Sequence, residues 1–229
     1  MKRIACLHAN HSNIPLLDEA VAPWNAELVH YVDPGSLLQH TGVCSPTTEQ
    51  SHDRLISQLL WMEAANPDAI VITCTQYAAA LKAEDEARLR TPVFTIDGPF
   101  LADIAEREGP QTLLFANPAT VTPTMQRLQA YAAANGLRPQ IEVRQLTGAF
   151  ALLMENKQEA YLEAVRRALD ELLSATGQAS LSVAQLSMVP VARRFTAETG
   201  RAIGHPLQSL TTRIVQTLQL EWAESSNRS

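Results

Sequence analysis

The amino-acid sequence predicts an α/β fold made of two similar lobes. Short apolar or β-branched runs end in polar loops and then give way to helical patterns, which is typical of βα units around a mostly parallel sheet. In addition, the motif ANHSNIP at residues 9–15 returns as ANPATVTP at residues 116–123, 107 residues further along the chain. This repeat predicts a duplicated architecture.

A second pair of segments supports the duplication. Pro99 and Pro206, each inside a similar tripeptide, are also 107 residues apart, and between these markers ITCTQ at residues 72–76 corresponds to VAQLS at residues 183–187. The correspondence sets Cys74 opposite Gln185. We expect two lobes related by a pseudo-twofold axis, with one active-site cleft between them. The expected lobes are residues 1–107 together with a C-terminal helix in 208–229, and residues 108–207.

Each lobe is predicted to contain a four-stranded, mostly parallel sheet flanked by helices. The first four strands are expected at residues 4–7, 27–31, 69–72 and 93–96, and the other four at residues 112–115, 141–145, 181–184 and 201–203.

Three helices stand out. Residues 53–64 and 157–173 carry apolar side chains at i, i+3 and i+4 spacing, which is the pattern of a helix that covers a sheet. Pro123 is expected in the first turn of a third helix, and Gly136 is expected to end it in a left-handed conformation. The repeat predicts the matching helix of the first lobe after Pro15.

The composition restricts the class of protein. The 229 residues carry a formal net charge of −6, and Lys and Arg are scattered, so no basic stripe is available for nucleic acid. No stretch approaches the length of a membrane span, and we expect a soluble cytoplasmic protein. Three cysteines at irregular spacings form neither a disulfide framework nor a zinc pattern. We expect Cys6 in the core and Cys44 in a loop.

Polar residues cluster where the predicted strands end. In open parallel sheets ligands bind beyond these carboxyl ends. Asn and Ser or Thr ahead of a helix offer amide, hydroxyl and backbone N–H groups that suit a carboxylate, although plain helix capping explains them as well. The candidate residues are Asn10, His11, Ser12, Cys74, Thr75, Asp97, Asn117, Thr120, Gln185, Ser187 and His205.

Cys74 is the strongest catalytic candidate among them. It ends an apolar strand and begins a turn to a helix, where N–H groups would favour the thiolate and lower the thiol pKa below about 8.5. A buried structural cysteine is the alternative. His11 and His205 are candidate acid/base groups, although a histidine near a strand end is often only a hydrogen-bonded loop residue. The sequence contains no GxGxxG, P-loop, HExxH or GxSxG motif, so neither a nucleotide nor a metal is expected.

These motifs together resemble the aspartate/glutamate racemase superfamily, which includes hydantoin racemases, maleate isomerases and arylmalonate decarboxylases. The resemblance covers the whole chain. It implies a cofactor-independent isomerase, a homodimer, and a small carboxylate substrate flanked by two cysteines that move a proton on opposite faces. Cys74 takes the place of the first cysteine, whereas Gln185 stands where the second belongs.

This departure leaves three functions open, because an amide carries no proton at neutral pH. In the first alternative, the chain is an enzyme with one catalytic cysteine that acts at the carbon beside a carboxylate. This class includes one-sided lyases, decarboxylases and cis–trans isomerases. Alternatively, Ser187, His11 or His205 replaces the missing acid/base and racemisation persists. In the third alternative, the cleft binds a small carboxylate without turning it over.

Overall fold

The computed structural model describes residues 1–34, 47–176 and 180–223. Two compact units divide the chain: Met1–Pro99 together with the segment from Leu210 onward, and Phe100–Ser209. By this division the helix α6 (Gly98–Glu106) has most of its residues in the second unit, whereas the sequence assigned it to the first lobe. Cys44 and the C-terminal residues 224–229 lie outside the described residues.

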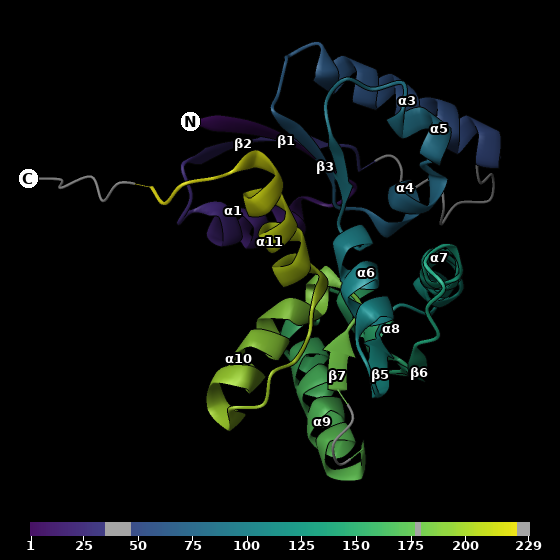
Figure 1. The fold of residues 1–229 in the computed structure, drawn as a ribbon. Coiled ribbons are helices and arrows are strands. Elements are labelled where there is room, and N and C mark those ends of the chain that lie inside the picture. The colour runs from purple at the N-terminus through teal and green to yellow at the C-terminus, as the bar shows by residue number, and fades with distance from the viewer. Residues whose placement is uncertain (35–46, 177–179, 224–229) are drawn as a thin grey trace, which may run out of the picture. The chain divides into compact units, whose positions relative to one another are not determined.

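The first unit contains a four-stranded parallel sheet of order β2-β1-β3-β4 (Figure 1). All four strands predicted for this lobe are confirmed. Their bounds are β1 Lys2–His8, β2 Ala26–Val32, β3 Ala69–Ile72 and β4 Val93–Thr95.

The helices of this unit follow its strands, as βα connections require. The predicted helix at 53–64 begins earlier, because Thr47 and Gln50 form a reciprocal capping box that starts it at Thr48. The elements are η1 His11–Asn13, α1 Ile14–Val21, α3 Thr48–Glu63, α4 Thr75–Ala80 and α5 Ala83–Glu86, and α11 Pro206–Leu218 spans the boundary between the units.

Alternation along β1 assigns its side chains to the two faces of the sheet. Ala5 and Leu7 pack with Leu55 and Leu59 of α3. Successive strand residues point to opposite faces, so Cys6 and His8 lie on the other face. Cys6 is fully buried there, as the sequence predicted.

The second unit contains a three-stranded parallel sheet of order β6-β5-β7, with β5 Pro110–Phe115, β6 Gln140–Gln145 and β7 Ser180–Val183. The predicted fourth strand at 201–203 is wrong. Only a single parallel bridge, between Ser182 and Gly204, lies in its place. Residues 201–203 follow Gly200, which ends one helix in a left-handed conformation, and they pair with no strand before Pro206 begins the next helix. A Cβ on Gly204 would come within 2.5 Å of the Ser182 hydroxyl, so this close approach needs glycine.

The helices of the second unit include the predicted helix with Pro123 in its first turn, which ends at Ala134 and is followed by Gly136 with φ 67°. Besides α6 the elements are η2 Pro118–Thr120, α7 Val121–Ala134, α8 Ala149–Met154, α9 Gln158–Thr176, η3 Leu186–Met188 and α10 Val189–Thr199.

Helices cover both faces of this sheet. On one face, Leu114 packs with residues of α9 and α10 that include Val165 and Phe195. On the other face, its neighbours in sequence, Leu113 and Phe115, pack with α6 and α7. Adjacent β5 residues therefore belong to two separate cores, which explains why residues 113–115 at the end of β5 are all apolar.

The two sheets share one strand order. In each, the first strand is central, the second lies on one side and the third on the other. The Gly204 bridge extends the second sheet beyond β7, where β4 stands in the first. The duplication predicted from the sequence thus appears in the topology. The pseudo-twofold axis stays a prediction. Within the described residues, no helix combines the length and apolarity needed to cross a membrane.

Candidate active-site residues in the two units

The loop after β1 carries three of the predicted residues of the first unit. Asn10, His11 and Ser12 are all exposed. Asn10 caps η1, because its side-chain oxygen accepts a hydrogen bond from the Ser12 N–H at 3.0 Å. This is the helix-capping role that the sequence left open for Asn10.

Cys74 follows β3, which lies directly beside β1 in the sheet. It is partly buried, as is Thr75, the first residue of α4. Its side chain makes no helix-capping hydrogen bond. The loops that carry Asn10 and Cys74 thus leave neighbouring strands at the same edge of the sheet.

The expectation of a lowered Cys74 pKa is wrong. Burial is the largest influence and raises the pKa of the thiol above its ordinary value. The backbone N–H groups of Tyr77 and Gln76 act in the opposite direction, and the negative charges of Asp97 and Asp33 raise the pKa further. The loss of water around the sulfur outweighs these N–H groups, and it cannot be seen from the position of Cys74 at the start of a helix. Cys74 is therefore a protonated thiol at neutral pH.

Asp33 is a residue near this site that the sequence analysis missed. It follows β2 and is largely buried. Its carboxylate accepts two hydrogen bonds from Arg54, both 2.8 Å long, and one of 2.5 Å from the Tyr77 hydroxyl of α4. A further bond comes from Gln58. These bonds hold the pKa of Asp33 well below its usual range. The signal in the sequence was an Asp at a strand end, before Pro34.

The loop after β5 repeats the geometry of the loop after β1. Asn117 caps η2 and its side-chain oxygen accepts from the Ala119 N–H at 3.0 Å, the same length as the Asn10 bond. Thr120 is buried, and its hydroxyl donates to the Asn117 carbonyl at 2.9 Å.

Gln185 occupies the end of β7, the place that Cys74 occupies after β3. Its side-chain oxygen accepts from the backbone N–H groups of Ala116 at 2.9 Å and Asn117 at 3.0 Å. Its side-chain nitrogen donates to the Thr120 hydroxyl at 2.7 Å and, over 3.4 Å, to the Asn117 carbonyl. The amide therefore ties the end of β7 to the loop after β5.

Ser187 and His205 are also held within the second unit. The Ser187 hydroxyl lies 2.7 Å from the hydroxyl of the buried Tyr161. The Nδ1 atom of the buried His205 accepts from the N–H of Gln208 in the first turn of α11, at 3.1 Å. Burial lowers the pKa of His205 to about 4, and the charge of Arg193 adds to this. The lone pair of His205 Nδ1, which would take a proton from a substrate, is thus already used in this hydrogen bond.

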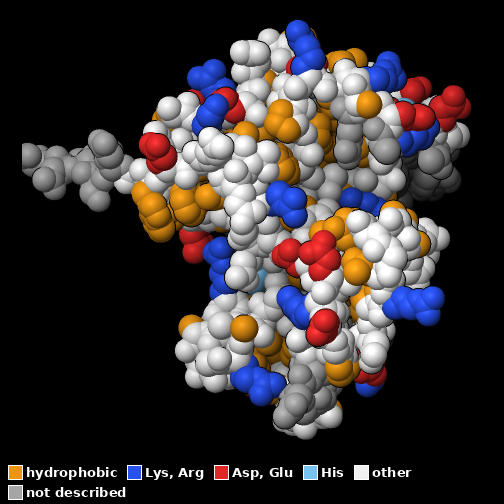
Figure 2. All heavy atoms as spheres, in the orientation of Figure 1, with side chains coloured by type: hydrophobic (Ala, Val, Ile, Leu, Met, Phe, Trp, Pro, Cys, Tyr) orange, Lys and Arg blue, Asp and Glu red, His pale blue; other side chains and the backbone are white. Residues whose placement is uncertain are grey.

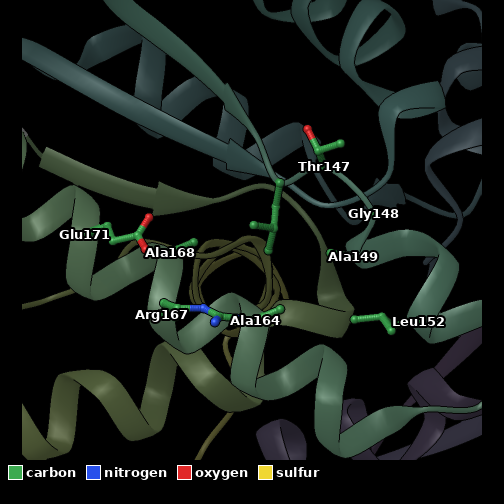
Figure 3. A pocket seen from close by; sticks show the side chains of 9 residues that line it. Thr147, Gly148, Ala149, Leu152, Ala164, Arg167, Ala168 and Glu171 are labelled. Atoms are coloured by element: carbon green, nitrogen blue, oxygen red, sulfur yellow. The ribbon is translucent and has the colours of Figure 1, made fainter.

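Two cavities lie away from the site residues that the sequence predicted. One, of about 310 Å³, lies between the start of α8 and α9, where Thr147, Arg167 and Glu171 are among its lining residues (Figure 3). The other, of about 380 Å³, lies between β2 and α3 and includes Asp33, Arg54 and Trp61 in its wall. None of the site residues predicted from the sequence lines either cavity. On the face shown in Figure 2, acidic and basic side chains are interspersed.

No family model and no curated protein matches the sequence. Solved structures do match over nearly the whole chain. An allantoin racemase from Klebsiella pneumoniae has a TM-score of 0.68 at 15% identity and covers 99% of this chain and 92% of its own. The fold is that of the aspartate, glutamate and allantoin racemases.

Two further racemases extend this likeness. The aspartate racemase of Picrophilus torridus has a TM-score of 0.67 at 10% identity and covers 98% of this chain and 97% of its own. A glutamate racemase of Bacillus anthracis has a TM-score of 0.66 at 12% identity and covers 95% of this chain and 82% of its own. The racemase fold predicted from the sequence motifs is thus confirmed at identities where sequence comparison alone finds nothing.

Proposed function

We propose that this chain is a racemase-like enzyme, a cofactor-independent isomerase that transfers a proton at the carbon next to a carboxylate of a small acid. Cys74 is its single catalytic cysteine. Its proposed substrate contacts are Asn10, Ser12, Thr75, Asn117, Thr120 and Ser187. The observation that carries the proposal is the contrast between a thiol after β3 and a fully hydrogen-bonded amide after β7.

Cys74 is suited to deliver a proton. Its raised pKa keeps the thiol protonated before the reaction, and the N–H groups of Gln76 and Tyr77 stabilise the thiolate that remains afterwards. The same N–H groups favour the reverse step, in which the thiolate removes a proton from the substrate. The first lobe alone therefore supplies acid/base chemistry on one face of a substrate carbon.

Gln185 has a positioning role in this proposal. An amide neither accepts nor releases a proton at neutral pH, and its oxygen is already bound to two backbone N–H groups. It fixes the loop that carries Asn117 and Thr120, so these two residues keep their geometry for a substrate carboxylate. Symmetric two-cysteine racemisation is not available to such a site.

One-sided lyase or decarboxylase chemistry is a second candidate, favoured by the protonated state of Cys74. A decarboxylation leaves a carbanion or enolate that needs a proton on one face only, and a resting thiol supplies it. His11 is exposed, and His205 Nδ1 already accepts a hydrogen bond from the Gln208 N–H. Both histidines are therefore weaker candidates for a second acid/base group than Cys74 is for the first.

Deuterium incorporation tests the proposal. The protein is incubated in D₂O with amino acids, hydantoins, hydroxy acids, malonates and dicarboxylates, and ¹H NMR follows exchange and product formation. Cys74→Ser should abolish the reaction, whereas Cys44→Ser, the matched thiol control, should leave it unchanged. Exchange with retained configuration supports one-sided proton transfer, and inversion requires a second acid/base group. Ligand binding without any exchange, with Cys74→Ser binding equally well, would identify a carboxylate-binding protein instead.

We also propose that the protein is cytoplasmic, as its composition suggests, and that it is a homodimer, as the resemblance implies. Sedimentation equilibrium should give twice the 25.1 kDa mass of the chain. A monomer at micromolar concentration would contradict the dimer.

A further inference from the structure

The face of the first sheet opposite α3 places three metal-ligating side chains together. Cys6 and His8 are two residues apart on β1 and share a face, and the strand register pairs Cys6 with His30 of β2. The Cys6 sulfur and one ring nitrogen from each histidine all lie within 4.8 Å of one another. Cys6 and His8 are fully buried, and the His30 side chain is 18% exposed.

The outer nitrogen of each histidine has its own partner. His30 Nε2 lies 3.0 Å from the carboxylate of Asp18 on α1, and a carboxylate only accepts, so this nitrogen carries the hydrogen. His8 Nδ1 lies 3.0 Å from the Thr73 hydroxyl. That hydroxyl donates to the Leu7 carbonyl at 3.1 Å, so it accepts from His8.

This assignment leaves two lone pairs facing each other. The inner nitrogens, His8 Nε2 and His30 Nδ1, are 2.9 Å apart. With both outer nitrogens protonated, two neutral imidazoles would repel at this distance. A positive charge between them removes the repulsion, and that charge is either a shared proton or a metal ion. The Cys6 sulfur beside the pair supplies a third ligand for a metal, which a shared proton does not need.

We propose that Cys6, His8 and His30 form a binding site for a zinc-type transition metal ion. Sulfur and imidazole ligands suit Zn²⁺, whose bonds of about 2.0–2.3 Å put tetrahedral ligand atoms roughly 3.5 Å apart. In the structure the two inner nitrogens are 2.9 Å apart and all three ligand atoms lie within 4.8 Å of one another. Small side-chain shifts would therefore bring the three atoms to tetrahedral spacing. Binding releases the Cys6 thiol proton to solvent, so the ligating sulfur is a thiolate.

The surroundings match those of known metal sites. A ligating histidine usually donates its other N–H to a carboxylate or another acceptor, which fixes the ring. Asp18 and the Thr73 hydroxyl provide these acceptors for the two rings. The ion would link β1 to β2 and, through the hydrogen bond between His30 and Asp18, to α1. No metal was expected from the sequence, because these ligands follow no zinc-finger spacing.

Cobalt(II) titration of the chelator-treated protein tests this site without any enzyme assay. A bound cobalt with one thiolate ligand gives an intense near-ultraviolet charge-transfer band. We expect this band in the native protein and in Cys74→Ala, and its loss in Cys6→Ala. Asp18→Asn removes an exposed carboxylate that supports a ligand, and should weaken cobalt binding about 10–100-fold. Glu19→Gln, its neighbour on α1, is the matched control. Zn²⁺ should raise the Tm of the native protein, and the Tm should continue to rise with the logarithm of the free Zn²⁺ concentration above the dissociation constant.

A native protein that shows no charge-transfer band at saturating cobalt would overturn the proposal and leave a shared proton between the histidines. A band that persists in Cys6→Ala, or equal cobalt affinities for Asp18→Asn and Glu19→Gln, would also overturn it. Because Asp18 lies on the surface, its variant decides the question even when Cys6→Ala fails to fold.

Discussion

The two units can be compared at the ends of their first strands and at the ends of their third strands. After the first strands, Asn10 and Asn117 make the same capping bond to the residue two positions later, at the same length. After the third strands the side chains differ in chemistry, because Cys74 carries a thiol and Gln185 carries an amide. The duplicated framework has kept the side chains that shape its loops, whereas the position that moves a proton in our proposal is present on one side only.

The largest effect is expected from the unequal pair. Cys74→Ser replaces the thiol with a hydroxyl that neither donates nor accepts a proton readily near neutral pH. Proton exchange into the substrate should fall by about 10²–10⁴-fold. NMR exchange rates measured beside Cys44→Ser check this, and a Cys74→Ser enzyme with native rates would remove the cysteine from the mechanism.

Removing the other member of the pair should affect stability first. Gln185→Ala leaves the Ala116 and Asn117 N–H groups without their acceptor and the Thr120 hydroxyl without its donor. We expect the free energy of unfolding to fall by about 2–4 kcal/mol. Urea denaturation measures this. Gln129→Ala, at an exposed position, is the control. If Gln185→Ala lowers the unfolding free energy no more than this control does, the Gln185 amide does not stabilise the loop after β5.

The buried His205 has no matching histidine in the first unit and should give the second unit a pH dependence. Its folded pKa, lowered to about 4 from 6.5, means that the unfolded chain binds the proton more readily. The contribution to stability is full above pH 6.5 and is lost as the pH falls toward 4, by roughly 2–3 kcal/mol. Urea unfolding at several pH values, beside His205→Asn, isolates it. An unchanged pH slope in the variant would contradict the assignment.

The smallest effect concerns the equal pair. Asn10→Ala and Asn117→Ala each remove one capping bond, and each should cost about 1 kcal/mol of unfolding free energy. Thermal unfolding of the two variants should show similar losses. A clear difference between them would mean that one asparagine has a further partner that the other lacks.

The sequence was most informative where periodicity and short motifs act locally. All four strands of the first sheet, the helix with Pro123 in its first turn and the left-handed Gly136 were predicted, because strand alternation and turn residues follow from backbone geometry. The strand expected at 201–203 was not formed, and the parallel bridge in this segment joins Gly204, one residue later, to Ser182 of β7. A short apolar run does not by itself reveal whether its backbone will find a partner strand, because pairing depends on segments far away in the sequence.

The sequence by itself determined the duplicated α/β architecture and the identity of the two unequal residues, since both depend on residues in linear order. Only the tertiary structure decided their chemical state. Burial raises the Cys74 pKa, and four hydrogen bonds occupy Gln185, through residues about 65 to 69 positions away in the chain. The convergence of Cys6, His8 and His30 was likewise decided by strand register. Desolvation and long-range hydrogen bonds depend on which segments meet in space, and no local pattern in the sequence encodes that.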